Sequence, residues 1–310
     1  MSGTCRCLLI FFCFLQICLP QMLEEPKNFD IVPRVVNGWP AKKGDVPYQI
    51  AFKSLRYRYK RIYMTFCGGV IIAPNKLVTA AHCFDEKTSP CRKFWGKSVK
   101  ASKKLVARTY AVAGNLYNLA VFSSKDTFED GQWRRLREVI YPRVYDFPKF
   151  DIAVAFTINP FHYDAYVGPI PIASRYRDYV GKCLVSGYGR ISKKETSEYL
   201  ILAHLDLIPR RQCNAIHHRN MQHYVCTSGR ISDVQKGDSG GPLVCQGTGD
   251  PNEKDKGILV GIVSGHRERA GTFFTRVSSY YNYIQSKSMA RQQESFDISI
   301  PKYILTETTM

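Results

Sequence analysis

Short apolar runs, separated by glycine, proline and polar clusters, make up most of the chain after residue 35. Four representative runs, rich in Val, Ile, Leu, Tyr and Phe, are Tyr48–Phe52, Val70–Ile72, Leu184–Ser186 and Leu259–Val263. Runs of this kind are typical of strands, and their repetition predicts an all-β sandwich or barrel. The stretch Ser278–Gln293 differs, since it carries Tyr, Ile and Met among polar residues without Gly or Pro, and it predicts a C-terminal helix.

The longest apolar run lies at the N-terminus. Residues 8–19 follow Arg6 and are almost entirely apolar, which is too short for a membrane span and typical of a signal-peptide core. We therefore expect residues 1–19 to be a signal peptide, residues 20–34 to be a polar pro-segment, and the protein to be secreted and extracellular. A membrane-anchored N-terminus is the alternative, and no other run is long and apolar enough to span a membrane.

The chain has a formal net charge of +18, and residues 1–34 contain equal numbers of basic and acidic residues. The excess positive charge therefore lies after Arg34. Such a field favours polyanions, acidic proteins or anionic surfaces as partners, although a basic protein without a dedicated partner is an equally good interpretation. Basic residues and tyrosines alternate over residues 53–61, which predicts a hairpin with basic residues on one face and tyrosines on the other.

Three segments carry residues suited to nucleophilic catalysis. They are Thr79–Cys83, Phe150–Val154 and Gly237–Pro242, and they contain His82, Asp151 and Ser239 respectively. Glycines beside a serine permit a sharp turn and bring N–H groups close to a reacting carbonyl. A serine hydroxyl is a poor nucleophile until a base takes its proton, and imidazole, with an unperturbed pKa near 6.5, is suited to that task. Each residue alone would be an ordinary structural residue, but His, Asp and Ser in this chain order match a catalytic triad.

Together with Arg34-Val35-Val36-Asn37-Gly38, these segments resemble the trypsin/chymotrypsin family of secreted serine proteases. The resemblance covers residues 35–290 and leaves a C-terminal tail over residues 291–310. It implies two antiparallel six-stranded β-barrels with a C-terminal helix, and hydrolysis of peptide bonds in a protein substrate without a cofactor. It also implies an activating protease and a protein inhibitor as further partners.

The same resemblance implies roles for residues around the triad. The N–H groups of Gly237 and Ser239 would form the oxyanion hole, and Ser264 would support Asp151. Cleavage after Arg34 would free an amino group on Val35, which would pair with Asp238 and order the oxyanion loop. The alternative is that Arg34 ends an exposed linker.

Substrate preference would depend on Asp233, which lies six residues before Ser239 at the floor of the family's specificity pocket. A carboxylate there favours Arg or Lys before the cleaved bond, and Ser264 and Gly265 would line the pocket wall. An Asp233 in a surface turn is the alternative.

The pocket sequence departs from the family pattern at several positions. A cysteine is replaced by Gln235, and Thr272 falls where a glycine keeps the pocket open. Ser264-Gly265-His266 replaces the family's Ser-Trp-Gly wall, so the aromatic face of the pocket is missing. The loop that follows is short and contains Arg267 and Arg269, either of which would neutralise the pocket carboxylate.

Seven cysteines follow the signal region, and sequence alone leaves their connectivity open. The resemblance implies the pairs Cys67–Cys83, Cys183–Cys245 and Cys213–Cys226. Cys91 is then left over, as a free thiol, an intermolecular bridge or a partner of Cys18.

Metal binding is not expected. The segment Gly114–Asn118 lacks the carboxylates of the family's calcium loop, and His217, His218 and His223 are interpreted as solvated loop residues without a matching ligand set.

Two basic segments, residues 53–61 and residues 84–105, border the substrate cleft in the family, and the second carries Arg92, Lys93, Lys97, Lys100, Lys103 and Lys104. They are interpreted either as an anion-binding surface or as solvated charged loops. Together with the altered pocket wall, they leave two further interpretations of the protein open. A catalytically weak or inactive homologue would use this surface to bind or regulate a partner. A narrow-specificity protease would use it to select an acidic substrate or a polyanion such as heparin.

Overall fold

The computed structural model describes residues 38–86, 98–189, 195–228, 237–267 and 271–287. The expected signal peptide, pro-segment and C-terminal tail lie outside these ranges, as do Arg34, Val35, Cys91 and Asp233.

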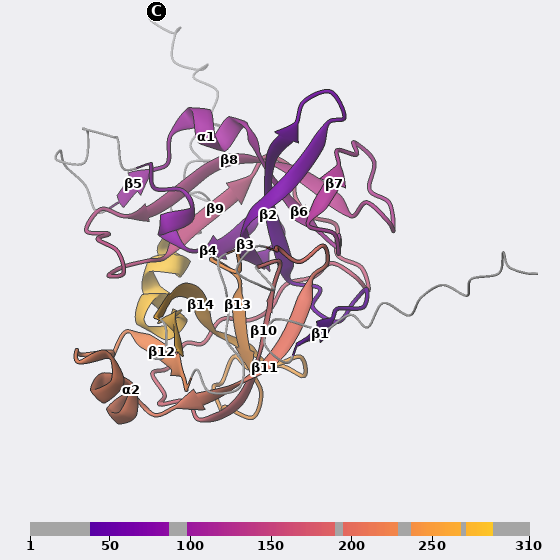
Figure 1. The fold of residues 1–310 in the computed structure, drawn as a ribbon. Coiled ribbons are helices and arrows are strands. Elements are labelled where there is room, and N and C mark those ends of the chain that lie inside the picture. Colours follow the sequence, from indigo (N-terminus) through magenta and orange to yellow (C-terminus); the bar gives the residue numbers. More distant parts are fainter. Residues whose placement is uncertain (1–37, 87–97, 190–194, 229–236, 268–270, 288–310) are drawn as a thin grey trace, which may run out of the picture. The chain divides into compact units, whose positions relative to one another are not determined.

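Six antiparallel strands form the first barrel, in the order β2-β6-β8-β9-β4-β3, and pairing of β3 with β2 closes it (Figure 1). The strands are β2 (Gln49–Tyr57), β3 (Ile62–Ala73), β4 (Lys76–Thr79), β6 (Thr109–Ala113), β8 (Gln132–Pro142) and β9 (Ala153–Thr157). Two short strands extend this sheet, β5 (Ser98–Lys100) on β8 and β7 (Leu119–Val121) on β3. Apolar side chains such as Phe52, Ile71 and Leu77 are fully buried in its core.

The second barrel is closed in the same way, in the order β11-β10-β13-β14-β15-β12, with β12 paired to β11. Its strands are β10 (Gly181–Gly187), β11 (Ile201–Ile208), β12 (Tyr224–Thr227), β13 (Pro242–Cys245), β14 (Ile258–Arg267) and β15 (Gly271–Arg276), and β1 (Trp39–Pro40) pairs with β11. A further buried cluster contains residues of both barrels, among them Val78, Ile152 and Ile262. The two barrels therefore share apolar packing.

Helical structure is limited in the described part of the chain. It comprises η1 (Ala81–Cys83), α1 (Lys103–Ala107), α2 (Arg210–His217) and η3 (Val277–Tyr280), and η3 continues into an α-helix over residues 281–287. The predicted fold, two antiparallel six-stranded barrels with a C-terminal helix, is confirmed.

Three disulfides join the same cysteine pairs that the family resemblance implies. Cys67–Cys83 links β3 to η1, Cys183–Cys245 links β10 to β13, and Cys213–Cys226 links α2 to β12. The first of these holds the short helix that carries His82 against β3.

The basic segments differ from their predicted form. Residues 53–61 belong to a hairpin, as predicted, but Lys53 is fully buried and does not join a basic face. In the second segment, β5 and α1 occupy part of what the sequence indicates as a loop, and the Ser102 side chain caps α1 by accepting from the Leu105 N–H at 3.2 Å.

Candidate active site

Sheet pairing brings His82 and Asp151 together. His82 lies in η1, just after β4, and Asp151 lies just before β9; β4 and β9 are neighbours, with Thr79 opposite Ala153. His82 Nδ1 is 2.8 Å from Asp151 Oδ2, and the His82 backbone N–H donates to Asp151 Oδ1 at 2.9 Å. One carboxylate thus contacts both the ring and the backbone of the histidine. An Nδ1–H held in this way leaves Nε2 as the ring nitrogen able to accept a proton.

Both barrels supply hydrogen bonds to Asp151, whose side chain is fully buried. Ser264 Oγ on β14 donates to Asp151 Oδ2 at 2.6 Å, and Thr275 Oγ1 on β15 donates to the Asp151 carbonyl at 2.7 Å. A buried carboxylate is costly without such partners, so these donors keep it in place. The His82 side chain remains 23% exposed, so a substrate can approach it from solvent.

Ser239 lies in the turn before β13, directly beside the segment that leads to His82. Its carbonyl accepts from the Gly68 N–H of β3 at 2.7 Å, and the next residue, Gly240, donates to the Val263 carbonyl at 2.8 Å. Gly240 has φ +78°, and a Cβ there would collide with the Thr79 hydroxyl and approach the Gly68 carbonyl oxygen to 2.5 Å. Only glycine fits this close approach, and it packs the Ser239 turn against the end of β4.

Asp238, just before the candidate nucleophile, is buried and lies against Gly187 and Gly189. Its Oδ1 accepts from the Gly189 N–H at 2.7 Å. A Cβ on either glycine would collide with this carboxylate, so the chain forms a tight recess around it. Gly237, the other proposed oxyanion donor, has φ +112°, a conformation that glycine adopts without strain.

The expected specificity pocket is described only in part. Gly265 lies on β14 against the ring of Phe273, and Thr272 is fully buried on β15, where its N–H donates to Thr227 Oγ1 at 3.0 Å. Asp233, Gln235 and Arg269 lie outside the described residues.

Among the residues that the structure describes, two groups bring potential metal-ligand atoms within 4.8 Å of one another, Cys67–His82–Cys83 and Cys213–His217–Cys226. In both groups the sulfurs are joined in a disulfide and cannot act as thiolate ligands. The interpretation of His217 as a solvated residue is wrong, because it is buried at the end of α2 with its ring 5.7 Å from that of Phe273. Burial, with Arg267 and Arg219 nearby, lowers its pKa. His218 and His223 are exposed, as expected.

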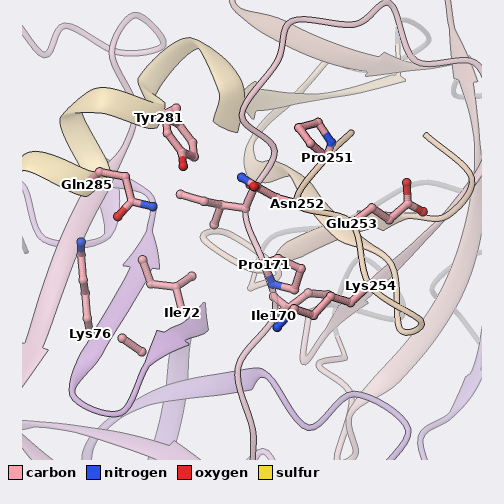
Figure 2. Close-up of a pocket in the computed structure, with 12 residues that line it drawn as sticks. Ile72, Lys76, Ile170, Pro171, Pro251, Asn252, Glu253, Lys254, Tyr281 and Gln285 are labelled. Carbon is pink, nitrogen blue, oxygen red and sulfur yellow. The ribbon is translucent and has the colours of Figure 1, made fainter. Parts of the chain in front are cut away.

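Two buried lysines were missed by sequence reasoning. Lys53 lies within the first barrel. The Lys76 amine donates to the Ile284 carbonyl of the C-terminal helix at 2.6 Å. Lys76 also lines a cavity of about 430 Å³ (Figure 2). The cavity lies between the β3–β4 turn, residues 170–172, residues 251–254 and this helix, and none of the candidate triad residues lines it. For Lys53, its position directly after the strand-like run that ends at Phe52 was the available signal of burial.

Comparison with known proteins gives a consistent result. The family model described as Trypsin matches residues 35–284. Kallikrein 1-related peptidase b3 of Mus musculus is 28% identical over 246 residues, which are 75% of this chain and 80% of that protein. Transmembrane protease serine 9 of Rattus norvegicus and Coagulation factor XI of Bos taurus are each 28% identical, over 264 and 272 residues. The chain spans 22% and 38% of the length of these two proteins.

Within the described residues, no helix is both long enough and apolar enough to cross a bilayer.

Proposed function

The chain belongs to the trypsin family, and from this premise we propose that it is a secreted serine endopeptidase made as a zymogen. The observation that carries the proposal is the fully buried Asp151, which contacts His82 Nδ1 at 2.8 Å while Ser264 donates to the same oxygen at 2.6 Å. The packing of Gly240 on the end of β4 adds support, because it brings the Ser239 turn to the same end of the barrel. Two of the relatives reported above are named as a serine protease and as a peptidase.

Each of the three residues would have a distinct task. Ser239 Oγ attacks the carbonyl carbon of the peptide bond while His82 Nε2 takes its proton, and the imidazolium then gives that proton to the leaving amine. Water hydrolyses the resulting acyl-enzyme by the same proton transfers in reverse. Asp151 holds the ring tautomer and stabilises the imidazolium. The Gly237 and Ser239 N–H groups would stabilise the oxyanion, and one such donor contributes about 3–4 kcal/mol.

Activation would follow cleavage after Arg34. The new amino group of Val35 would enter the protein and pair with the Asp238 carboxylate. The burial of Asp238 in a recess formed by glycines supports this role, since a buried carboxylate is stabilised by an ammonium partner. The processed enzyme would then extend over residues 35–290, after a signal peptide at 1–19 and a pro-segment at 20–34, with residues 291–310 as a tail. Its disulfides suit an extracellular location.

Specificity for Arg or Lys before the cleaved bond would come from Asp233, with Ser264 and Gly265 in the pocket wall. Profiling the activated enzyme against a peptide library tests this assignment. Lack of enrichment for either basic residue would remove the role given to Asp233.

A labelling experiment tests the catalytic proposal. The Arg34-cleaved protein is incubated with a fluorophosphonate probe, and we expect a covalent adduct on Ser239 that the Ser239→Ala variant does not form. If the cleaved, folded protein takes up no probe, the chain is better interpreted as a catalytically inactive homologue. If Ser239 is labelled, an activating protease and a protein inhibitor are expected as further partners.

The inactive-homologue alternative is motivated by the altered pocket wall at Ser264-Gly265-His266. Such a homologue would use the exposed basic cluster of the β2–β3 hairpin, formed by Arg56, Arg58, Lys60 and Arg61. Such a cluster would bind a polyanion such as heparin in either case. Changing the four residues to serine should shift elution from a heparin column to lower salt, because phosphate- or sulfate-like contacts release counterions. Unchanged elution would argue against polyanion binding by this cluster.

A further inference from the structure

One face of the β2–β3 hairpin and β7 leaves large apolar side chains in solvent. Tyr57, Leu119 and Val121 are 52%, 47% and 57% exposed. Tyr57 lies opposite Ile62, which lies opposite Val121, and Met64 lies opposite Leu119. Cross-strand partners project to the same side of a sheet, as do residues two apart on one strand. These five side chains therefore lie on one apolar face, on which Tyr57, Leu119 and Val121 are exposed and Ile62 and Met64 are half-buried.

The backbone of β7 offers hydrogen bonds along the same edge. Phe122 N–H donates to the Arg61 carbonyl at 3.3 Å, and Thr65 N–H donates to the Asn118 carbonyl at 3.2 Å, which fixes the register at both ends of β7. Because hydrogen-bonded and non-hydrogen-bonded pairs alternate in an antiparallel sheet, the main-chain groups of Leu119 and Val121 point away from β3. Within the described ranges β7 pairs only with β3. An edge of this kind accepts an added strand.

Charge is distributed unevenly along this edge. The hairpin turn carries the exposed basic cluster of Arg56, Arg58, Lys60 and Arg61, and residues 53–62 contain no acidic residue. The Arg61 guanidinium lies over the ring of Phe122, 5.0 Å from its centre, so one basic group is held directly beside the end of β7. At the opposite end of β7, the Asn118 N–H donates to the Glu198 carbonyl at 2.8 Å, and Glu198 is exposed. A bound segment would therefore place acidic side chains near Arg61.

The same strand connects this face to the candidate active site. Gly68 on β3 donates its N–H to the Ser239 carbonyl at 2.7 Å. Met64 precedes Gly68 by four residues, which is about 13 Å along a strand. A polypeptide whose peptide bond lies at Ser239 would reach the apolar face after about four extended residues.

We propose that β7 and its neighbouring hairpin are a docking edge for an extended segment of a protein substrate, in which apolar side chains alternate with Asp or Glu. The role of this segment as part of a substrate rests on the proposed protease function, whereas its docking on β7 does not. The segment adds a strand along β7, places its apolar side chains on the face of Tyr57, Leu119 and Val121, and directs its acidic side chains toward Arg61. A second copy of this chain is a poor occupant, because two molecules of net charge +18 repel each other.

Binding is tested with the full chain carrying Ser239→Ala, so that no bound peptide is cleaved. A phage-displayed library of random linear peptides is selected on this protein, and we expect the selected peptides to alternate apolar residues with Asp or Glu. Their affinity should fall about tenfold or more with Val121→Ser, because the added strand would bury the valine side chain and a serine gains far less from leaving water. Val180→Ser is the matched control, since Val180 is 63% exposed just before β10 and outside the proposed edge, and it should leave affinity unchanged.

A second variant separates strand addition from apolar contact alone. Val121→Pro removes an N–H that points away from β3, so β7 keeps its pairing while the added strand loses a hydrogen bond. Equal urea midpoints for the variants and the parent protein show that folding is intact. The proposal would be overturned if the selected peptides bound Val121→Ser and the parent protein equally. It would also be overturned if the selected peptides lacked acidic residues. A protein that binds heparin but selects no peptide would refute it as well.

A kinetic arm distinguishes this proposal from the protease function. A selected segment is attached beyond the cleaved bond of a fluorogenic peptide, and we expect a KM about tenfold lower than that of the short peptide, with the gain lost in Val121→Ser. Peptide binding without any fluorophosphonate labelling would refute the protease function and retain the docking edge. Labelling with no effect of the attached segment would refute its role in substrate selection.

Discussion

Lys53 provides a test of how the first barrel accommodates a buried charge. The residue is fully buried, and its Nζ donates to Thr65 Oγ1 at 2.9 Å and to the carbonyls of Tyr117 and Asn118 at 2.6 and 2.7 Å. None of these three acceptors is a carboxylate, and burial lowers the pKa of Lys53 to about 7. We predict that the titration of this amine contributes to the pH dependence of folding stability.

The sign follows from the lowered pKa. Between pH 7 and pH 10.5 the unfolded chain keeps the proton on Lys53 while the folded protein releases it, so the unfolded state binds more protons and stability rises with pH. Below pH 7 both states are protonated and this contribution does not change. One group with these two pKa values adds about 2 kcal/mol of stability between pH 7 and pH 9.

Urea unfolding of the Ser239→Ala protein and of the same protein with Lys53→Met measures this effect, with disulfides intact and at intervals from pH 6 to about pH 10. The difference in unfolding free energy between the two proteins should shift by about 2 kcal/mol from pH 7 to pH 9, in favour of the lysine. Other titrating groups are common to both and cancel. Lys60→Met is the control, because Lys60 is exposed on the same hairpin and should give no shift. A difference that stays constant over the range would show that Lys53 does not titrate there.

Three further substitutions test the site and the barrel around it. Ser264→Ala removes a hydrogen bond to the buried Asp151 carboxylate of the proposed triad, so steady-state kinetics should show kcat/KM lowered about 10- to 100-fold; an unchanged value would mean that Ser264 does not support Asp151. Gly240→Ala should lower the unfolding free energy by about 2 kcal/mol or more, since a Cβ at φ +78° collides with a threonine hydroxyl, and an unaffected melting temperature would refute that contact. Arg134→Met breaks the 2.6 and 2.8 Å hydrogen bonds to Asp126, whose side chain is 32% exposed, and should cost about 1 kcal/mol. The paired arginine lowers the pKa of Asp126, so this contribution is present above pH 3.8 and lost as pH falls further; equal acid sensitivity of the two proteins would contradict it.

Local pattern was enough to predict the strands but not the environment of every residue on them. Each of the four representative apolar runs lies within a strand, apart from Tyr48, which directly precedes β2. The alternation over residues 53–61 correctly predicts a hairpin, yet it assigns Lys53 to an exposed basic face. The acceptors at residues 117 and 118 lie more than sixty positions further along the chain, and no periodicity within the hairpin reports them. His217 was misjudged for the same reason, because the ring of Phe273 covers it from another strand.

The candidate site depends on both barrels at the level of one carboxylate. Asp151 belongs to the first barrel, but its side chain accepts from Ser264 and its carbonyl from Thr275, which lie 113 and 124 residues away in the second. Motifs identify the residue types at His82, Asp151 and Ser239, whereas the orientation of the imidazole requires both barrels to be closed and packed together. A loss of packing in the apolar cluster that contains Ile152 and Ile262 would therefore release the donors of Asp151 while each barrel kept its own hydrogen-bonded ladder. Catalytic competence would consequently be lost before strand structure, since the site is formed by the packing between barrels and not by either barrel alone.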